Sequence, residues 1–402
     1  MKKVKFGSYP LFHNPNNNYI YLNIKKGGSI MYFKISKRPF YNALSAVSRA
    51  ISANTPIPAL SGIKIDVNEN EICLTGSDSD ISIKKTITKG EEMVLDIKET
   101  GSIVIEAKYI LEIVRKIDAD EVEVEIIDGS LTRFKGLSTE FKINGMKSHD
   151  YPTIDFSKPE KEFNIAADLL MKIIMQTGFA TSDKETRPVL TGVNFRCQGT
   201  KLECVATDSF RLAKKIVYLN EENDFNITIP AKSLNEIAKT IEKDSVVEIA
   251  VSDKKVQFYI DKTIIQTRLI DGAYPETERL IPMEFTNEVV LDSRDILNAI
   301  DRASFIKNDG ISIVKITANS EEFIVSSKSQ EVGSSTEKIS SVSYTGSPIE
   351  ISFSGRYVFD AVKALEASEI KICFSGEMKP FIIKDTKDDN IIQLVLPVRT
   401  YA

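Results

Sequence analysis

The chain has 402 residues, of which 42% are hydrophobic and 27% are charged, and its formal net charge at pH 7 is −5. This length exceeds one ordinary core and predicts two or three domains. The composition is typical of a globular protein, with no bilayer-length apolar run and no secretory signal. The acidic balance disfavours a generic nucleic-acid binder with a basic outer surface, but it leaves room for a local basic stripe.

Motifs for nucleotide, cofactor or hydrolytic chemistry are missing from the sequence. No GxGxxG, GxxxxGK[ST] or GxSxG pattern occurs. Two histidines, His13 and His149, leave little scope for histidine acid–base chemistry or for multi-histidine metal sites. The cysteines have no metal-ligand spacing and lie in strand-like apolar runs, at Cys73, Cys197, Cys204 and Cys373. We therefore expect reduced, mostly buried thiols in a cytoplasmic protein without a cofactor or metal.

The first thirty residues differ from the rest of the chain. They are rich in Asn and Gly, and a clean amphipathic pattern begins at Met31. Codons for Lys26-Gly27-Gly28 can form a purine-rich ribosome-binding site at a suitable distance before Met31. Residues 1–30 are then either a translated leader before a natural start at Met31 or a flexible N-terminal arm. From Met31 onward there are 372 residues, three times the repeat period described next, which favours the leader.

One helical pattern occurs three times at intervals of 124 residues, in segments 106–118, 230–243 and 354–367. Each copy begins with a cation, continues with an acid four residues later and a base seven residues later, and places apolar residues on the opposite side. The cations are Lys108 and Arg115, Lys232 and Lys239, and Arg356 and Lys363. The interleaved acids are Glu112, Glu236 and Asp360.

A second predicted helix precedes each copy, at 39–52, 167–182 and 293–307. Short alternating runs between the helices predict antiparallel strands. Two connecting segments, 145–160 and 271–282, each contain a Tyr-Pro pair that favours an extended linker. We therefore predict three α+β domains, at 31–154, 155–280 and 281–402.

The three pairs of cations allow two interpretations. Residues seven apart lie almost above one another on a helix, so each pair shares one face. The face is either a solvated surface held by intrahelical ion pairs or a surface that contacts DNA phosphates without reading bases. The acids between the cations would keep such phosphate contacts weak, as suits a protein that moves along DNA. The residues alone leave both interpretations open.

The stretch "VATDSFRLAKK" (205–215) also allows two interpretations. Asp208 beside Ser209 resembles part of a hydrolytic site, but no histidine lies nearby in the sequence. The first repeat has Asp78 at the matching place and the third has Ser329, which suits a turn-stabilising side chain better than a catalyst. A repeat-built peptide-binding scaffold that does not encircle DNA is a third possibility.

Several segments together resemble the bacterial sliding clamp, the beta subunit of DNA polymerase III, of the type found in low-GC Gram-positive or wall-less bacteria. They are "NTPIPALSGIKI", "RPVLTGVNF", "VATDSFRLA", "DGAYPETERLIP" and the terminal "QLVLPVRTY". The resemblance covers essentially all of 31–402. It implies a non-enzymatic processivity factor, without catalytic residues, that slides on duplex DNA as a head-to-tail dimeric ring, with helices lining the hole and sheets outside.

Ring size explains why the resemblance implies two chains. With helices about 10 Å apart, twelve helices give a circle about 36 Å across and leave roughly 26 Å clear, whereas six leave only about 8 Å for a duplex about 20 Å wide.

The resemblance also implies a pocket in which polymerase, clamp loader and repair proteins insert short linear motifs. Its residues would be Leu190, Thr207, Ser209, Phe210, Arg211, Leu212, Pro275, Arg279, Leu280, Ile311, Leu396, Pro397, Val398 and Arg399. DNA would face Arg187 and the six cations named above. The dimer interface would join an edge strand with Phe141 and Ile143 to the helix that carries Phe305 and Ile306.

This chain departs from the family pattern at several of these positions. Asn54 replaces a loop arginine, and Pro188 and Val189 replace an aromatic pair, so the helix cations carry more of the expected DNA contact. Phe210 stands where many relatives have a histidine or another polar aromatic residue, which predicts a shifted partner preference.

Overall fold

The computed structural model describes residues 31–52, 54–90, 93–241, 244–307 and 310–399. The leader prediction for 1–30 lies outside these described residues. Within them, no helix is long and apolar enough to cross a membrane. The described residues also contain no group of three or more His, Cys, Asp or Glu side chains that could hold a metal ion.

Three units of similar make-up follow one another along the described chain. The first contains β1 (Tyr32–Ser36), α1 (Lys37–Ser48), β2 (Gly62–Val67), β3 (Glu71–Ser77), β4 (Ile81–Thr88), β5 (Leu95–Glu99), β6 (Gly101–Glu106), α2 (Ala107–Lys116), β7 (Glu121–Asp128), β8 (Leu131–Lys135), β9 (Glu140–Asn144) and β10 (Met146–Lys147). The second contains β11 (Lys161–Ala166), α3 (Ala167–Thr177), β12 (Gly192–Thr207), β13 (Arg211–Pro230), α4 (Ala231–Ala238), β14 (Val246–Val251), β15 (Lys255–Ile260) and β16 (Thr263–Arg268). The third contains β17 (Asn287–Asp292), α5 (Ser293–Ala303), β18 (Ile313–Ala318), β19 (Phe323–Ser329), β20 (Gly333–Ile339), β21 (Ser341–Thr345), β22 (Ile349–Ser354), α6 (Gly355–Leu365), β23 (Glu369–Phe374), β24 (Phe381–Asp385) and β25 (Ile391–Val395).

All six predicted helices are present, because each buries one apolar stripe under its sheets. The stripe residues Ile110, Leu234 and Val358 occupy matching places and are fully buried. The helices are shorter than predicted. The largest difference is at α4, which ends at Ala238, with Lys239 as its C-terminal cap rather than a residue of the helix.

Two of the four sheets cross from one unit to the next. The nine-stranded sheet has the order β10-β6-β2-β3-β4-β16-β15-β14-β11, and the seven-stranded sheet has the order β12-β13-β25-β24-β23-β17-β21. The junctions are the antiparallel pairs β4–β16 and β13–β25. The sheets β5-β1-β7-β8-β9 and β20-β19-β18-β22 each stay within one unit. The backbone ladder therefore fixes each unit against its neighbour.

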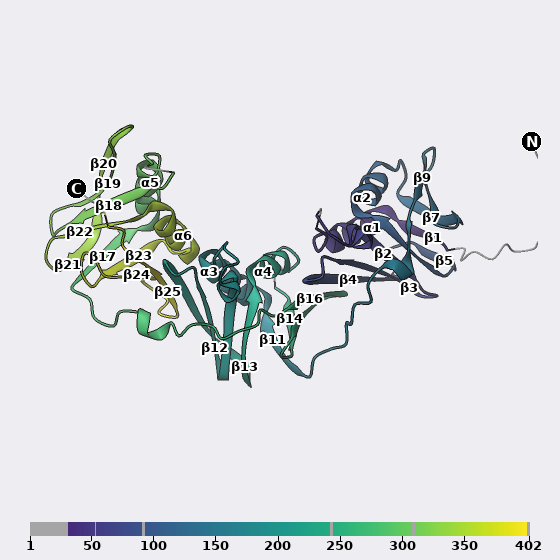
Figure 1. Cartoon of the computed structure of the whole chain (residues 1–402), viewed down its shortest axis with the longest axis horizontal. Coiled ribbons are helices and arrows are strands. Elements are labelled where there is room, and N and C mark those ends of the chain that lie inside the picture. Colours follow the sequence, from purple (N-terminus) through teal and green to yellow (C-terminus); the bar gives the residue numbers. More distant parts are fainter. Residues whose placement is uncertain (1–30, 53, 91–92, 242–243, 308–309, 400–402) are drawn as a thin grey trace, which may run out of the picture.

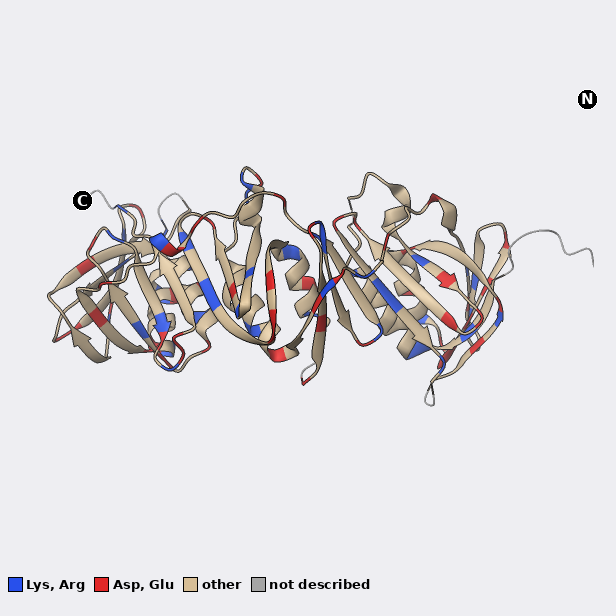
Figure 2. Ribbon diagram, turned by 90° about the horizontal axis from the view of Figure 1, so that it is seen from below, with Lys and Arg blue, Asp and Glu red and all other residues tan. Residues whose placement is uncertain are grey.

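The three units form an open arc (Figure 1). The helices lie on its concave side and the sheets on its convex side (Figure 1). On the sheet side, Lys and Arg are interspersed with Asp and Glu (Figure 2). The described charges on this outer side thus show no single basic surface, as the net charge predicts.

The four cysteines are free and buried, which confirms the expectation of reduced core thiols. Burial raises the pKa of the Cys373 thiol to about 11 and raises the pKa values of Cys73, Cys197 and Cys204 above the ordinary value. Because the thiolate is the reactive form, these side chains are inert structural residues.

Candidate partner pocket, helix face and ring edges

The loop between β12 and β13 is a side-chain-capped turn. The Asp208 carboxylate accepts hydrogen bonds from the backbone N–H groups of Phe210 (2.9 Å) and Arg211 (3.0 Å), and Ser209 has a positive φ of 78°. Asp78 makes the same pair of bonds in the first unit, where Ser79 has a φ of 84°. The turn prediction for Asp208 is confirmed. A carboxylate committed to two backbone donors and an arginine is not poised to activate Ser209.

Val205 and Leu212, on either side of this turn, belong to a small apolar cluster. The cluster contains Val205, Leu212, Cys373, Ile382 and Leu394, with Tyr274, Ile281, Phe285, Ile392 and Leu396 packed against it. The Phe210 ring remains 56% exposed. Leu280 is also about half exposed. Exposed apolar side chains beside a buried apolar floor form a site that can take an aliphatic or aromatic anchor.

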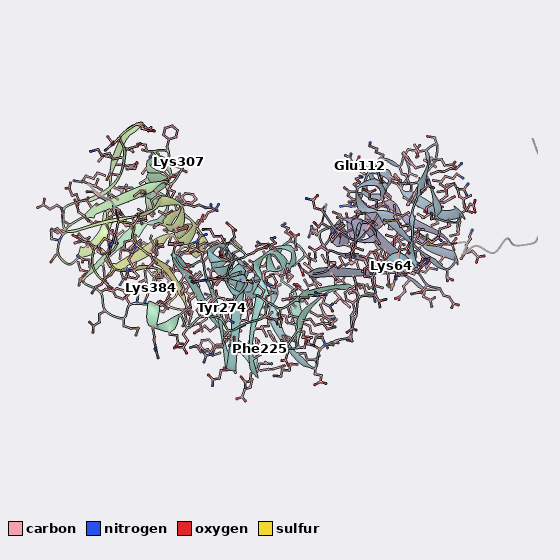
Figure 3. The ribbon with its side chains drawn as sticks, viewed as in Figure 1. Lys64, Glu112, Phe225, Tyr274, Lys307 and Lys384 are labelled. Carbon is pink, nitrogen blue, oxygen red and sulfur yellow. The ribbon has the colours of Figure 1, made fainter. Side chains whose placement is uncertain are left out.

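Hydrogen bonds join the three segments of chain at this site. The backbone N–H of Thr207 donates to the Tyr274 hydroxyl (3.0 Å), and burial raises the pKa of that hydroxyl. The backbone N–H of Leu396 donates to the Phe210 carbonyl (2.9 Å). Tyr274 is labelled in Figure 3, at the strands of the second unit. The linker and the C-terminal segment are thus held against the turn, as the resemblance implies.

The predicted pocket residues divide into a floor and an exposed rim. Thr207 and Leu212 are buried in the floor, whereas Ser209, Pro275, Arg279 and Arg399 are exposed. Pro397 and Val398 are partly exposed, and Val398 N–H donates to the Ser352 carbonyl (2.7 Å). Leu190 is buried in the turn Pro188–Thr191, and Ile311 is 57% exposed. No hydrogen bond or core cluster among the described residues joins Leu190 or Ile311 to the other pocket residues.

Arg211, which was predicted to form part of one pocket wall, has its side chain buried at the junction of the second and third units. Its Nε lies 3.0 Å from Asp208, and its Nη1 lies 2.8 Å from Asp360 on α6. The guanidinium lies between the rings of Phe179 (5.3 Å) and Tyr357 (4.6 Å). Phe210 lies in the turn just before β13 and is exposed, whereas Arg211 is the first residue of the strand and is buried. Phe179 and Tyr357 were not among the predicted site residues, and only their places in the repeats offered a signal for them.

We predict that Arg211→Met lowers the free energy of unfolding by about 3 kcal/mol, because two poorly solvated carboxylates lose their cation. Arg356→Met is the matched control. Arg356 contacts the same Asp360 carboxylate at 3.7 Å but is 73% exposed, so its loss costs less than about 1 kcal/mol. Urea unfolding followed by circular dichroism measures both variants. Equal midpoints would contradict a structural role for Arg211.

The predicted helix cations lie on α2, α4 and α6 or, in the case of Lys239, at the C-terminal cap of α4, and these helices are on the concave side (Figure 1). Arg115 pairs with Glu112 and Lys239 with Glu236, each at 2.7 Å, and Lys108 pairs with Glu106 at 2.6 Å. Lys232 and Lys363 are exposed and have no ion-pair partner among the described residues. Arg187 is exposed just before the turn Pro188–Thr191. Exposed pairs of this kind contribute about 0–1 kcal/mol, so a phosphate can compete for these cations.

Each end of the arc carries a free sheet edge. Among the described residues, β9 pairs with β8 alone, and β20 pairs with β19 alone. Phe141 and Ile143 lie on β9 and are partly exposed, which places them on an edge strand as predicted. Phe305, just beyond α5, is 80% exposed. Ile306 differs from the prediction because it is only 7% exposed and its surface is already covered within the chain.

An arc of repeated units, with helices inside, sheets outside and free edges at both ends, defines the class of ring-forming DNA clamps. Three family models match: the N-terminal domain of the DNA polymerase III beta subunit at residues 31–155, its central domain at 164–276 and its C-terminal domain at 278–399. The chain belongs to the DNA polymerase III beta subunit family.

Known proteins agree with this assignment. The beta sliding clamp of Bacillus subtilis is 40% identical over 378 residues, covering 92% of this chain and all of that protein. The crystal structure of the Bacillus subtilis DNA polymerase sliding clamp matches with a TM-score of 0.90 and 39% identity, covering 93% of this chain and all of that one. A sliding clamp from Bartonella birtlesii bound to griselimycin matches with a TM-score of 0.86 and 26% identity, covering 92% of this chain and all of that one.

Proposed function

We propose that two copies of this chain close a ring around duplex DNA and serve, without catalysing a reaction, as the processivity factor of a cytoplasmic replicative polymerase. The pocket around Phe210 would take short linear motifs of the polymerase, the clamp loader and repair proteins. Three domains, 31–154, 155–280 and 281–402, would each supply one sixth of the ring. The observation that carries this proposal is the shared strand register of the two junctions within the chain.

The two junctions use one register. In each, five residue pairs join the strand that follows the capped turn to the last strand of the next unit. Ile81 pairs with Thr267 and Lys85 with Thr263 at the first junction. Arg211 pairs with Val395 and Lys215 with Ile391 at the second.

Cross-strand partners identify the equivalent residues at the free edges. In the second unit, successive cross-strand pairs lead to the first junction through Phe163, Ile249, Phe258 and Ile265. In the first unit, the corresponding pairs lead to the free edge through Phe33, Val124, Phe134 and Phe141. On the other side of the first junction, cross-strand pairs join Ile65, Leu74 and Lys85. The corresponding pairs in the third unit join Ile316, Val325 and Glu337, which lies on the free edge. β9 is therefore the equivalent of β16, and β20 is the equivalent of β4. A third junction of the same kind would pair Gly333–Glu337 of one chain with Thr139–Ile143 of another.

The residues just beyond the first helix of each unit support the same junction between chains. Arg49, Phe179 and Phe305 occupy the same place just beyond α1, α3 and α5. Arg49 donates to the Lys239 carbonyl across the first junction (2.7 Å), and Phe179 packs against the cores on both sides of the second. Phe305 has no such cover in the single chain. A partner chain would supply it.

The register gives a specific cross-linking prediction. Lys142→Cys and Ser334→Cys would face each other across the ring interface, with Cβ atoms about 5 Å apart. Oxidation of a chain carrying both changes is expected to give covalent dimers on a denaturing gel, because the four natural cysteines are buried. Lys142→Cys with Ser335→Cys is the matched control, since a shift of one residue moves the side chain to the other face. Equal yields from both pairs would refute the register.

The concave cations give a second prediction. Replacing Lys108, Lys232 and Arg356 together by Glu reverses three charges per chain on the helices that would surround DNA. Because the contacts are electrostatic, retention on nicked circular DNA at low salt should fall at least tenfold. Gel filtration of loaded DNA measures this retention. Wild-type retention at low salt would count against a DNA-facing role, provided that light scattering still shows a dimer.

A further inference from the structure

A basic cavity lies at the junction of the first and second units. Its volume is about 430 Å³, and it is bounded by one side of α1, the end of β4, the β15–β16 turn and the end of α4. Its described charged lining residues are four cations and one acid, namely Arg49, Lys85, Lys239, Lys262 and Asp261. Since α1 and α4 are on the concave side of the arc (Figure 1), the cavity lies beside the space that DNA would occupy.

The cations are oriented but only partly neutralised. Arg49 uses one guanidinium nitrogen, Nη1, for the Lys239 carbonyl (2.7 Å) and the Thr240 hydroxyl (3.3 Å). Lys85 pairs with Asp261 at 3.0 Å, and Lys239 pairs with Glu236 outside the cavity. Lys262 donates to the Thr88 hydroxyl, which is uncharged. Arg49 and Lys262 therefore retain their full charge beside the cavity.

The second junction shows which of these charges the fold itself requires. The Lys85–Asp261 pair has its counterpart there in Lys215–Asp388 (2.6 Å), so this pair belongs to the junction. The place of Arg49 is taken by Phe179, and that of Lys262 by Asn390. A stable junction thus needs neither extra cation. The positive charges of Arg49 and Lys262 therefore exceed what the junction requires, although Arg49 also makes the hydrogen bond to the Lys239 carbonyl across it.

The cavity lies at the opposite end of the junction strands from the partner pocket. The pocket is at the Arg211 and Val395 end of the β13–β25 pairing. The cavity is at the Lys85 and Thr263 end of the β4–β16 pairing, which corresponds to Lys215 and Ile391. The strands run across the row of units (Figure 2). In a ring, the cavities of both chains would therefore open on the face away from the partner pockets.

We propose that this cavity binds a backbone phosphate of the encircled duplex where the duplex leaves the ring on that face. A phosphodiester matches a site that offers two cations without an ion-pair partner among the described residues. The proposal rests on the proposed function, because the duplex must pass through the ring to reach the site. It adds a contact at a domain junction to the contacts expected along the helices.

The test is the salt dependence of duplex binding by the full chain carrying Arg49→Gln and Lys262→Gln. Both side chains are exposed, so the fold should tolerate the changes. In fluorescence-anisotropy titrations of a labelled duplex, the slope of log affinity against log salt should become shallower by roughly 1 to 2, because up to two phosphate contacts per ring are lost. Arg196→Gln with Lys254→Gln removes the same charge from exposed positions outside the cavity and should leave the slope within experimental error of wild type.

A photocross-linker attached at Lys262→Cys gives a direct second readout. It should label DNA in rings loaded on nicked circles, whereas the same group at Lys254→Cys should not. Unchanged slope in the Arg49/Lys262 variant, or equal labelling from both positions, would overturn the proposal. Protection of Lys262→Cys from labelling by inorganic pyrophosphate with no change in the DNA slope would also overturn it, since the ligand would then be a free anion. Wild-type protein that does not stay on circles would instead refute the ring.

Discussion

A chain carrying Phe305→Asp is expected to elute as a monomer of 44.9 kDa, whereas the unaltered chain elutes at twice that mass. Phe305 is 80% exposed in the single chain, beyond the end of α5 and beside the free β20 edge. In the proposed ring it occupies the place that Phe179 fills at the second junction. A carboxylate there would lose its hydration against an apolar surface, at a cost of several kcal/mol.

The matched control is Tyr218→Asp, which places the same charge at an aromatic residue that is 63% exposed on β13. That variant should remain a dimer. Multi-angle light scattering at micromolar concentration measures both masses. A dimeric Phe305→Asp chain would reject this interface, and unchanged circular dichroism must accompany the monomer so that loss of the fold is not mistaken for loss of the contact.

Truncation after Val395 is expected to abolish binding of partner peptides and to leave the dimer intact. It removes Leu396, whose backbone N–H donates to the Phe210 carbonyl, and the segment through Arg399 that lines the proposed pocket. The last ladder pair, Arg211 with Val395, remains in place. Because a pocket loses most of its affinity when an apolar wall is lost, we expect at least a hundredfold fall.

Fluorescence titration of a labelled linear-motif peptide measures this loss, and light scattering checks the dimer. Arg399→Ala is the milder variant for comparison. It removes one charge at the rim and keeps the apolar wall, so a smaller fall in peptide affinity is expected. Unchanged affinity of the truncated chain would refute the pocket. Loss of the dimer in the truncated chain would show that the C-terminal segment supports the whole fold.

The local features of this fold were predictable because they depend on residues close in the sequence. Helical periodicity located all six helices, and the shared acid of two repeats predicted the Asp208 turn. The pairing of β4 with β16 and of β13 with β25 was not predictable, since strands more than a hundred residues apart meet through tertiary packing. Repeats in the sequence indicate similar units, but they do not state which edges join.

The segments that form the site were predictable from the sequence, but the directions of their side chains were less so. The turn, the linker and the C-terminal segment meet, and Phe210 is exposed as expected. The ion pair of Arg211 with Asp360 was not predictable, because the two residues lie far apart in the sequence. The burial of Ile306 was not predictable either, since the chain turns this side chain inward directly after exposed Phe305.

In the proposed ring, two chains enclose DNA topologically rather than bind its surface. The most direct measurement is gel filtration of protein loaded on nicked circular DNA, before and after a single cut that linearises it. We expect retention on the circle and release within minutes of the cut, at a salt concentration that leaves the dimer intact. Equal retention on circular and linear DNA, or no retention on either, would contradict the ring.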